Sequence, residues 1–178
     1  MVKEAAEMLY LKKRMLFHST VAKLLYLSKR ARPDIIAVIS FLCTRVKGLS
    51  VEDWEKLSKL LGYLKGTEDY VMRLRPGALF HVVAYVDASF SVHPDGKLHS
   101  GVVVKVGGAP VFFGSKKQKC VSNSPTEAEL VVLSDNVGFI ELFAEFVAFI
   151  MNSEQMRPLI YQDSTLVISM VTEGGGVT

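Results

Sequence analysis

The first part of the chain carries its apolar residues at helical spacing. Three runs repeat apolar residues three or four positions apart, which is the spacing that places them on one face of an α-helix: 17–32, 35–46 and 50–66. Pro33 closes the first run, and Ser50 stands three residues before Asp53 at the start of the third. The pattern predicts three helices, with Ser50 and Asp53 as a capping box and Gly66 as the C-cap of the third helix.

Short β-rich runs replace the helical repeat from about residue 78 onward. Strands are predicted at 80–90, 100–106, 109–113 and 159–162, and Gly107-Gly108 predicts a hairpin turn between the second and the third. Ser124-Pro125-Thr126-Glu127 opens a long helix with Ser124 and Glu127 as a capping box, and a last helix covers 164–172. The order is therefore β-β-β-α-β-α.

The two parts of the chain meet at Arg75-Pro76-Gly77, where proline and glycine interrupt regular structure. The alternating segment 70–74 just before it is predicted as an edge strand. The net charge changes sign at the same place: residues 1–76 carry 15 basic and 8 acidic residues (+7), whereas 77–178 carry 6 and 10 (−4). We therefore expect a small helical domain at 1–76 and a β/α domain at 77–178. The basic half indicates either a polyanionic partner or a solvated helical surface.

Composition excludes several classes of protein. With 178 residues and 49% hydrophobic content the chain can bury a core, which argues against a disordered chain. The two cysteines, Cys43 and Cys120, are too few for a disulfide framework and form no zinc-binding pattern, so a reducing intracellular compartment is expected. The longest apolar stretch, 130–151, contains three acidic residues, which argues against a membrane span and any membrane partner.

Three carboxylates have positions that suggest a metal site. Asp87 interrupts an apolar strand, Glu129 lies near the start of the long helix, and Asp163 follows the fourth strand. If the two strands are neighbours and the helix packs across them, the three converge, and a cluster of this kind needs cations. Mg²⁺ prefers such oxygen ligands, and two ions suit a phosphodiester. The alternative is structural: Asp163 as a turn or capping residue, and Glu129 as a residue that favours a helix N-terminus.

The acidic half contains four sequence motifs: Tyr85-Val86-Asp87-Ala88-Ser89, Ser115-Lys116-Lys117-Gln118, Ser124-Pro125-Thr126-Glu127-Ala128-Glu129-Leu130 and Ile160-Tyr161-Gln162-Asp163-Ser164. Together they resemble the RNase H domain of copia-type retrotransposon polyproteins. The basic half resembles the end of the reverse transcriptase region that precedes this domain, through Phe17-His18-Ser19-Thr20-Val21-Ala22-Lys23-Leu24-Leu25-Tyr26-Leu27 and Leu61-Gly62-Tyr63-Leu64-Lys65-Gly66-Thr67. The motifs are collinear from about residue 17.

The resemblance implies an α/β fold of the ribonuclease H type (mixed α+β, with a mixed sheet) and cleavage of the RNA strand of RNA–DNA hybrids. It places Asp87, Glu129 and Asp163 on acidic metal-ligand positions that hold two Mg²⁺ ions, with Mn²⁺ as an alternative. Glu129 is preferred to Glu127 because it directly precedes Leu130, as in the family motif. Expected partners are the hybrid and the reverse transcriptase region of the same polyprotein, inside the cell in cytoplasm, nucleus or a virus-like particle.

Other residues of the matched motifs are expected at the substrate: Ser89, Lys116, Lys117, Gln118 and Ser164. The alternative for the Lys-Lys-Gln segment is a solvated turn. His81, His93 and His99 are interpreted as strand or turn residues.

The family pattern continues beyond Thr178 with a Lys-His segment and a further acidic ligand, so we expect weak or no activity from this chain alone. Two alternative functions follow. One is a non-catalytic nucleic-acid-binding or interaction remnant that keeps the fold. The other is a different nuclease of the same fold, such as a resolvase or integrase core.

Overall fold

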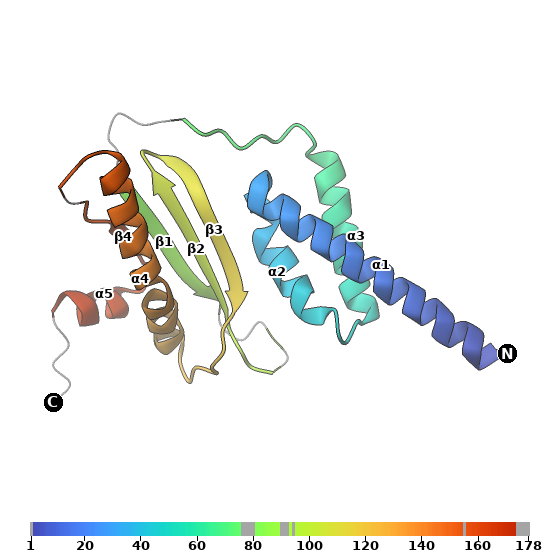
Figure 1. Cartoon of the computed structure of the whole chain (residues 1–178). Coiled ribbons are helices and arrows are strands. Elements are labelled where there is room, and N and C mark those ends of the chain that lie inside the picture. The colour runs from blue at the N-terminus through green and yellow to red at the C-terminus, as the bar shows by residue number, and fades with distance from the viewer. Residues whose placement is uncertain (1, 76–80, 90–92, 94, 155, 174–178) are drawn as a thin grey trace. The chain divides into compact units, whose positions relative to one another are not determined.

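The computed structural model describes residues 2–75, 81–89, 93, 95–154 and 156–173 (Figure 1). Contacts divide the chain into two compact units, Met1–Met72 and Arg73–Thr178. The boundary predicted near residue 76 lies outside the described residues. Each unit is considered by itself below.

The first unit is helical, as its apolar spacing predicts. It contains α1 (Val2–Arg30), the 3₁₀ helix η1 (Pro33–Ile35), α2 (Ile36–Arg45) and α3 (Val51–Gly66). The helix α1 begins at Val2, well before the apolar repeat at 17–32 from which the helix was predicted. The core is formed by apolar side chains from all four elements: Phe17, Val21, Leu24, Ile35, Ile39, Leu42, Leu57 and Leu60.

A capping box begins α3 as predicted. The Ser50 hydroxyl accepts a hydrogen bond from the Asp53 backbone (3.2 Å), and the Ser50 backbone donates to the Asp53 carboxylate (3.0 Å). Arg45 at the end of α2 pairs with the same carboxylate at 3.1 Å. Burial opposes ionisation of Asp53, but the hydrogen bonds from Ser50 and Arg45 lower its pKa below the ordinary value. The charged form of Asp53 therefore joins α2 to the start of α3.

The end of this unit differs from the sequence prediction. Gly66 is the last residue of α3 rather than its cap, and Thr67 caps the helix by donating its backbone N–H to Leu64 (3.2 Å). The strand predicted at 70–74 is wrong, because this segment forms no regular structure. Tyr70 instead donates its backbone N–H to Thr67, and its ring lies under the Arg32 guanidinium. Alternation alone does not make a strand without a neighbouring strand to pair with.

The second unit contains a four-stranded mixed sheet, in the element order predicted. Its strands are β1 (Val82–Ser89), β2 (His99–Val106), β3 (Ala109–Lys117) and β4 (Leu159–Tyr161), in the spatial order β3-β2-β1-β4. β1 pairs antiparallel with β2 and parallel with β4, and β2 pairs antiparallel with β3. The ends of the first strand predicted at 80–90 lie outside the described residues. The mixed α/β class is confirmed.

The hairpin between β2 and β3 and the edge strand β4 complete this sheet. Gly107 and Gly108 take positive φ angles of 56° and 85°, which suit the hairpin turn predicted there. β3 continues to Lys117, four residues beyond its predicted end. The short strand β4 lies at the edge, where Tyr161 stacks on Tyr85 of β1 with ring centroids 5.1 Å apart.

The helix α4 (Pro125–Ile150) covers one face of the sheet and connects β3 to β4, and α5 (Thr165–Thr172) follows β4 (Figure 1). A parallel pair of strands such as β1 and β4 requires a crossover connection of this kind. The core between α4 and the sheet consists of Val82, Ala84, Val86, Val102, Val104, Val132, Ile140, Ala144 and Val147.

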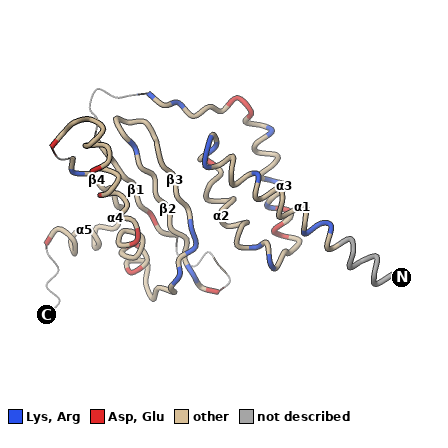
Figure 2. The backbone as a smooth tube through the Cα atoms, viewed as in Figure 1, with Lys and Arg blue, Asp and Glu red and all other residues tan. Residues whose placement is uncertain are grey.

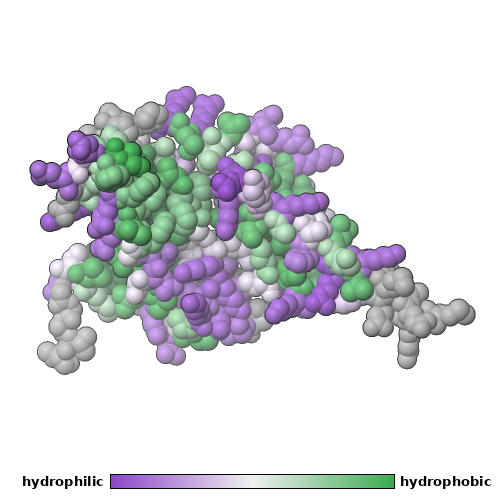
Figure 3. Space-filling view, viewed as in Figure 1, coloured by the Kyte–Doolittle hydropathy of each residue, from purple (hydrophilic) through white to green (hydrophobic). Residues whose placement is uncertain are grey.

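Not all apolar residues of α4 face this core. Leu142, Phe146, Phe149 and Ile150 are exposed along the C-terminal half of the helix, where Figure 3 shows a hydrophobic patch. Acidic residues but no lysine or arginine occur within α4, whereas basic residues are frequent in the first unit (Figure 2). Within the described residues, no helix combines the length and apolar character that crossing a membrane requires.

The two faces of α4 differ in how much a side chain contributes to stability. We expect Ile140→Ala to lower the free energy of unfolding of the second unit by about 3 kcal/mol, since Ile140 is fully buried and its loss leaves a cavity. The matched change Phe149→Ala removes a larger side chain that is 83% exposed, and should change stability by less than about 0.5 kcal/mol. Urea unfolding of both variants measures this, and equal losses would contradict the packing described.

Candidate functional site

The three acidic residues predicted as metal ligands come together at one end of the sheet. Asp87 lies on β1, Asp163 lies two residues after the end of β4, and Glu129 lies near the start of α4. Tyr85 is in register with Tyr161 on the neighbouring parallel strand, and Asp87 and Asp163 each come two residues later in the chain. One carboxylate oxygen of each residue lies within 4.8 Å of the other two. The convergence that the sequence analysis required is therefore present.

Glu129 is the buried member of the group and is held from two sides. Only 9% of Glu129 is exposed, whereas Asp87 and Asp163 are exposed. The Ala88 backbone N–H donates to Glu129 Oε1 at 3.2 Å, and the Gln162 side-chain amide donates to Oε2 at 2.9 Å. These donors fix the orientation of the carboxylate between the two strands.

The charges at this site are not balanced by the protein. Burial raises the pKa of Glu129, the hydrogen bonds from Gln162 and Ala88 oppose the rise, and the nearby charges of Asp87 and Asp163 add to it. In the described parts of the chain, no lysine or arginine forms an ion pair with any of the three carboxylates. Hard oxygen ligands in a cluster without a protein cation fit a divalent ion such as Mg²⁺.

Glu127, two residues before Glu129, forms hydrogen bonds at the N-terminus of α4 instead. The Ser124 hydroxyl accepts from the Glu127 backbone at 3.1 Å, as predicted. The Glu127 carboxylate, however, accepts from the Asn123 backbone at 2.6 Å, one residue before the N-cap, so the reciprocal bond of the predicted capping box is absent. Glu127 therefore stabilises the start of α4 and lies apart from the three acids.

The residues expected at the substrate have different surroundings. Lys116 pairs with Asp135 of α4 (3.2 Å) and Lys117 with Asp95 (2.7 Å), and both ion pairs are partly open to solvent. Gln118 is only 2% exposed, and its amide donates to Ser100 Oγ (2.9 Å). It also donates to the carbonyl of Ala128, next to Glu129. Gln118 is therefore placed to position the start of α4, and a nucleic acid would reach its side chain only after a rearrangement.

The two serines of the matched motifs lie at the ends of strands. Ser89 is the exposed last residue of β1, two positions beyond Asp87. Ser164 is the N-cap of α5, where its hydroxyl accepts from the Val167 backbone at 3.4 Å. Both follow a ligand candidate closely along the chain.

Histidines form a buried chain of hydrogen bonds that sequence reasoning missed. His99 Nδ1 lies 3.0 Å from His93 Nε2, and His99 Nε2 lies 2.7 Å from Ser115 Oγ. Burial, together with the charge of His93, lowers the pKa of His99, so its neutral form is favoured. These hydrogen bonds connect the turn before β2, through His99, to Ser115 of β3. This agrees with the interpretation of His93 and His99 as structural residues.

Gln162 is the other residue that the sequence did not indicate. It precedes Asp163, but no spacing rule shows that its amide turns back towards α4. Only the packing of α4 across β1 and β4 brings Gln162 and Glu129 together, 33 positions apart in the chain.

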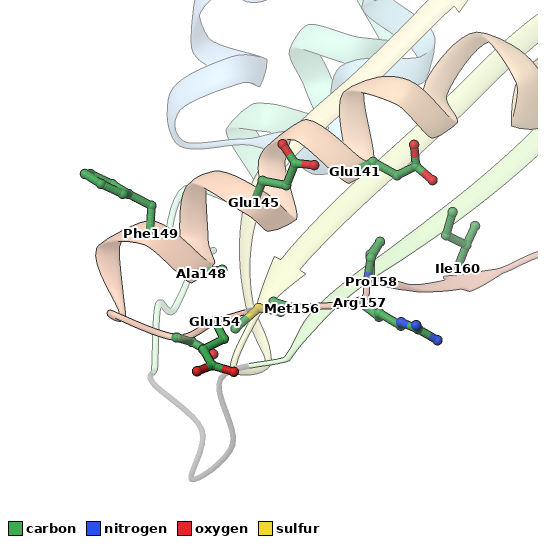
Figure 4. A pocket seen from close by; sticks show the side chains of 10 residues that line it. Glu141, Glu145, Ala148, Phe149, Glu154, Met156, Arg157, Pro158 and Ile160 are labelled. Atoms are coloured by element: carbon green, nitrogen blue, oxygen red, sulfur yellow. The ribbon is translucent and has the colours of Figure 1, made fainter.

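A hollow of about 1130 Å³ lies elsewhere on this unit (Figure 4). It is formed between the C-terminal half of α4 and the segment before β4, and its rim carries Glu141, Glu145 and Arg157. None of the three converging acids lines it. Asp87 and Asp163 are exposed at the surface of the unit, whereas Glu129 is buried.

Comparison with known proteins gives related sequences. The secreted RxLR effector protein 161 of Plasmopara viticola is 30% identical over 118 residues, which cover 66% of this chain and 83% of that protein. The retrovirus-related Pol polyprotein from transposon RE2 of Arabidopsis thaliana is 28% identical over 149 residues, 83% of this chain and 10% of the polyprotein. A transposon Ty5-1 protein of Saccharomyces cerevisiae is 32% identical over 123 residues, 68% of this chain and 40% of that protein. No family model and no solved structure matches the chain.

Relatives at 28–32% identity are retrotransposon Pol polyproteins and a transposon protein, which confirms the resemblance to a retrotransposon polyprotein that was stated from the sequence motifs. The chain spans only about a tenth of the length of the RE2 polyprotein.

Proposed function

We propose that the second unit is a metal-dependent endonuclease of the ribonuclease H type, which cleaves the RNA strand of RNA–DNA hybrids. The observation that carries the proposal is the convergence of Asp87, Glu129 and Asp163 within 4.8 Å, in a chain that is similar to retrotransposon Pol polyproteins. The β-β-β-α-β-α order, with one acid on the first strand, one on the first helix and one after the fourth strand, supports a fold of the ribonuclease H type.

The three carboxylates would hold Mg²⁺, or Mn²⁺ in its place. When bound, two such ions supply an activated water and stabilise the charge that develops on the phosphate. Asp87 and Asp163 present exposed oxygens towards solvent, where a phosphodiester can approach. Glu129 is held behind them by Ala88 and Gln162, so its oxygens keep their positions as substrate arrives.

The basic residues near the site would orient the nucleic acid. Lys116 and Lys117 at the end of β3 would contact the phosphate backbone, which supplies affinity but no sequence information. Each lysine would exchange its present carboxylate, Asp135 or Asp95, for a phosphate. Ser89 and Ser164, adjacent to the acids along the chain, would lie at the substrate, and contacts to the 2′-hydroxyl would distinguish RNA from DNA.

The proposal is tested by incubating the purified chain with end-labelled RNA–DNA hybrid, duplex DNA and duplex RNA, in Mg²⁺, Mn²⁺ or EDTA. We expect weak cleavage of the RNA strand of the hybrid alone, in either metal but not in EDTA. Cleavage of duplex DNA would favour another nuclease of the same fold. Salt-sensitive binding of the hybrid without cleavage in any metal would overturn the catalytic proposal and favour a non-catalytic nucleic-acid-binding module.

A further inference from the structure

Glu129 is connected to both strands of the site by residues that directly flank the other two acids. Its Oε1 accepts from the backbone of Ala88, the residue after Asp87. Its Oε2 accepts from the side chain of Gln162, the residue before Asp163. The first contact belongs to the backbone and is available to any residue except proline. The second depends on the side chain of one residue, Gln162.

The geometry of Gln162 fixes which end of its amide faces Glu129. The Asp163 backbone N–H donates to Gln162 Oε1 at 3.0 Å, so this atom must be the acceptor oxygen. The amide nitrogen then points to α4, where it donates to Glu129 Oε2 at 2.9 Å and to the Glu129 carbonyl at 3.3 Å. One half-buried side chain thus bridges the backbone of one acid and the carboxylate of another.

Without this bridge, the arrangement of the acids would be unfavourable. Three carboxylates lie close together, and no lysine or arginine of the described residues pairs with them. Their mutual repulsion favours rotation of the Glu129 side chain away from the other two. A neutral donor at 2.9 Å opposes that rotation and adds no charge that a cation would have to displace.

We propose that Gln162 is a positioning residue that holds Glu129 in the orientation in which all three carboxylates can bind one divalent ion. The inference rests on the proposed metal-dependent function and goes beyond it, because Gln162 is not one of the three candidate ligands. Glutamine is suited to this place, since the bridge needs one acceptor and one donor on a neutral group. Aspartate and glutamate lack the donor, and leucine, of similar size, lacks both.

The test compares Gln162→Leu with the control Asn136→Leu. Asn136 is buried on α4, the helix that carries Glu129, and its amide donates to the carbonyl of Val132 at 2.6 Å, a local bond within the helix. Binding of Mn²⁺ to the metal-free chain is measured by isothermal titration calorimetry, without nucleic acid. We expect the dissociation constant for Mn²⁺ to rise about 10-fold in Gln162→Leu, as is typical when a partner behind a metal ligand is removed, and to stay unchanged in Asn136→Leu.

Hybrid cleavage over a range of Mn²⁺ concentrations gives the second readout. A positioning role predicts that saturating metal restores most of kcat in Gln162→Leu, and that KM for the hybrid stays unchanged. Wild-type Mn²⁺ affinity in Gln162→Leu would overturn the role of Gln162 but leave the proposed function intact. Absence of Mn²⁺ binding to the wild-type chain would overturn the proposed function and the inference with it. An equal loss of affinity in both variants would assign the effect to general damage to α4.

Discussion

Asp87→Asn lowers the rate of hybrid cleavage by more than about a hundred-fold, the loss expected when a charged metal ligand becomes neutral. The change keeps the size of the side chain and its exposed position on β1, so the fold should be unaffected. Cleavage of labelled hybrid in Mg²⁺ under single-turnover conditions measures the loss, and circular dichroism confirms that the variant is folded. Mn²⁺ binding should weaken in parallel.

Glu141→Gln is the matched control for this experiment. Glu141 is an exposed carboxylate on the same unit, at the rim of the hollow on α4 and outside the converging group. Removal of its charge should leave cleavage within about two-fold of wild type, because exposed charges distant from a site contribute little. Full cleavage by Asp87→Asn would contradict the proposed function, and an equal loss in Glu141→Gln would show an effect of net charge alone.

We expect Glu129→Gln to lower the proposed metal-dependent cleavage as strongly as Asp87→Asn does. We also expect it to change how the stability of the folded chain depends on pH. The pKa of Glu129 in the folded chain is raised above its ordinary value of 4.5 by burial and by the charges of Asp87 and Asp163. A raised pKa means that the folded state binds the proton more tightly than the unfolded state does. Its stabilising contribution is complete below the unfolded pKa and is lost as pH rises through the folded pKa.

In EDTA, the stability of Glu129→Gln relative to wild type should therefore increase from about pH 4 to pH 7, since the variant has no charge to desolvate at position 129. Any constant offset from altered hydrogen bonds to Ala88 and Gln162 cancels in this comparison. Urea midpoints at several pH values give the measurement. Added Mg²⁺ should stabilise the wild-type chain but not the variant. A difference independent of pH would contradict the electrostatic description of the site.

The sequence predicted what depends on local patterns. Ser50 and Asp53 form the expected capping box, and Gly107-Gly108 forms the expected hairpin turn. Asp87 stands out because a charged residue within an apolar strand has few structural explanations. Two other predictions from local patterns were wrong. Segment 70–74 alternates but has no strand to pair with, and Gly66 resembles a helix cap although Thr67 takes that place.

The candidate site shows the same limit. The residue types of the three acids could be recognised from motifs, but the donors that hold Glu129 could not. Gln162 and Ala88 meet Glu129 across 33 and 41 positions of sequence. Gln118 is expected at the substrate from its place in a matched motif, yet the packing of α4 against the end of β3 buries it. Contacts of this kind follow from the arrangement of elements and leave no periodic signal.

The stability of the candidate site depends on the edge strand β4. It is only three residues long, pairs on one side with β1 alone, and its Leu159 and Tyr161 are more than half exposed. It is held by its pairing with β1, the packing of Ile160 against the core, the stacking of Tyr161 on Tyr85 and the Gln162 bridge. Detachment of such an edge costs less free energy than global unfolding, and it would carry Asp163 away from Asp87 while the hairpin and α4 stay folded. Loss of the site and loss of the fold are therefore separate events. Amide hydrogens at 159–163 should exchange with solvent well before those of the hairpin and α4.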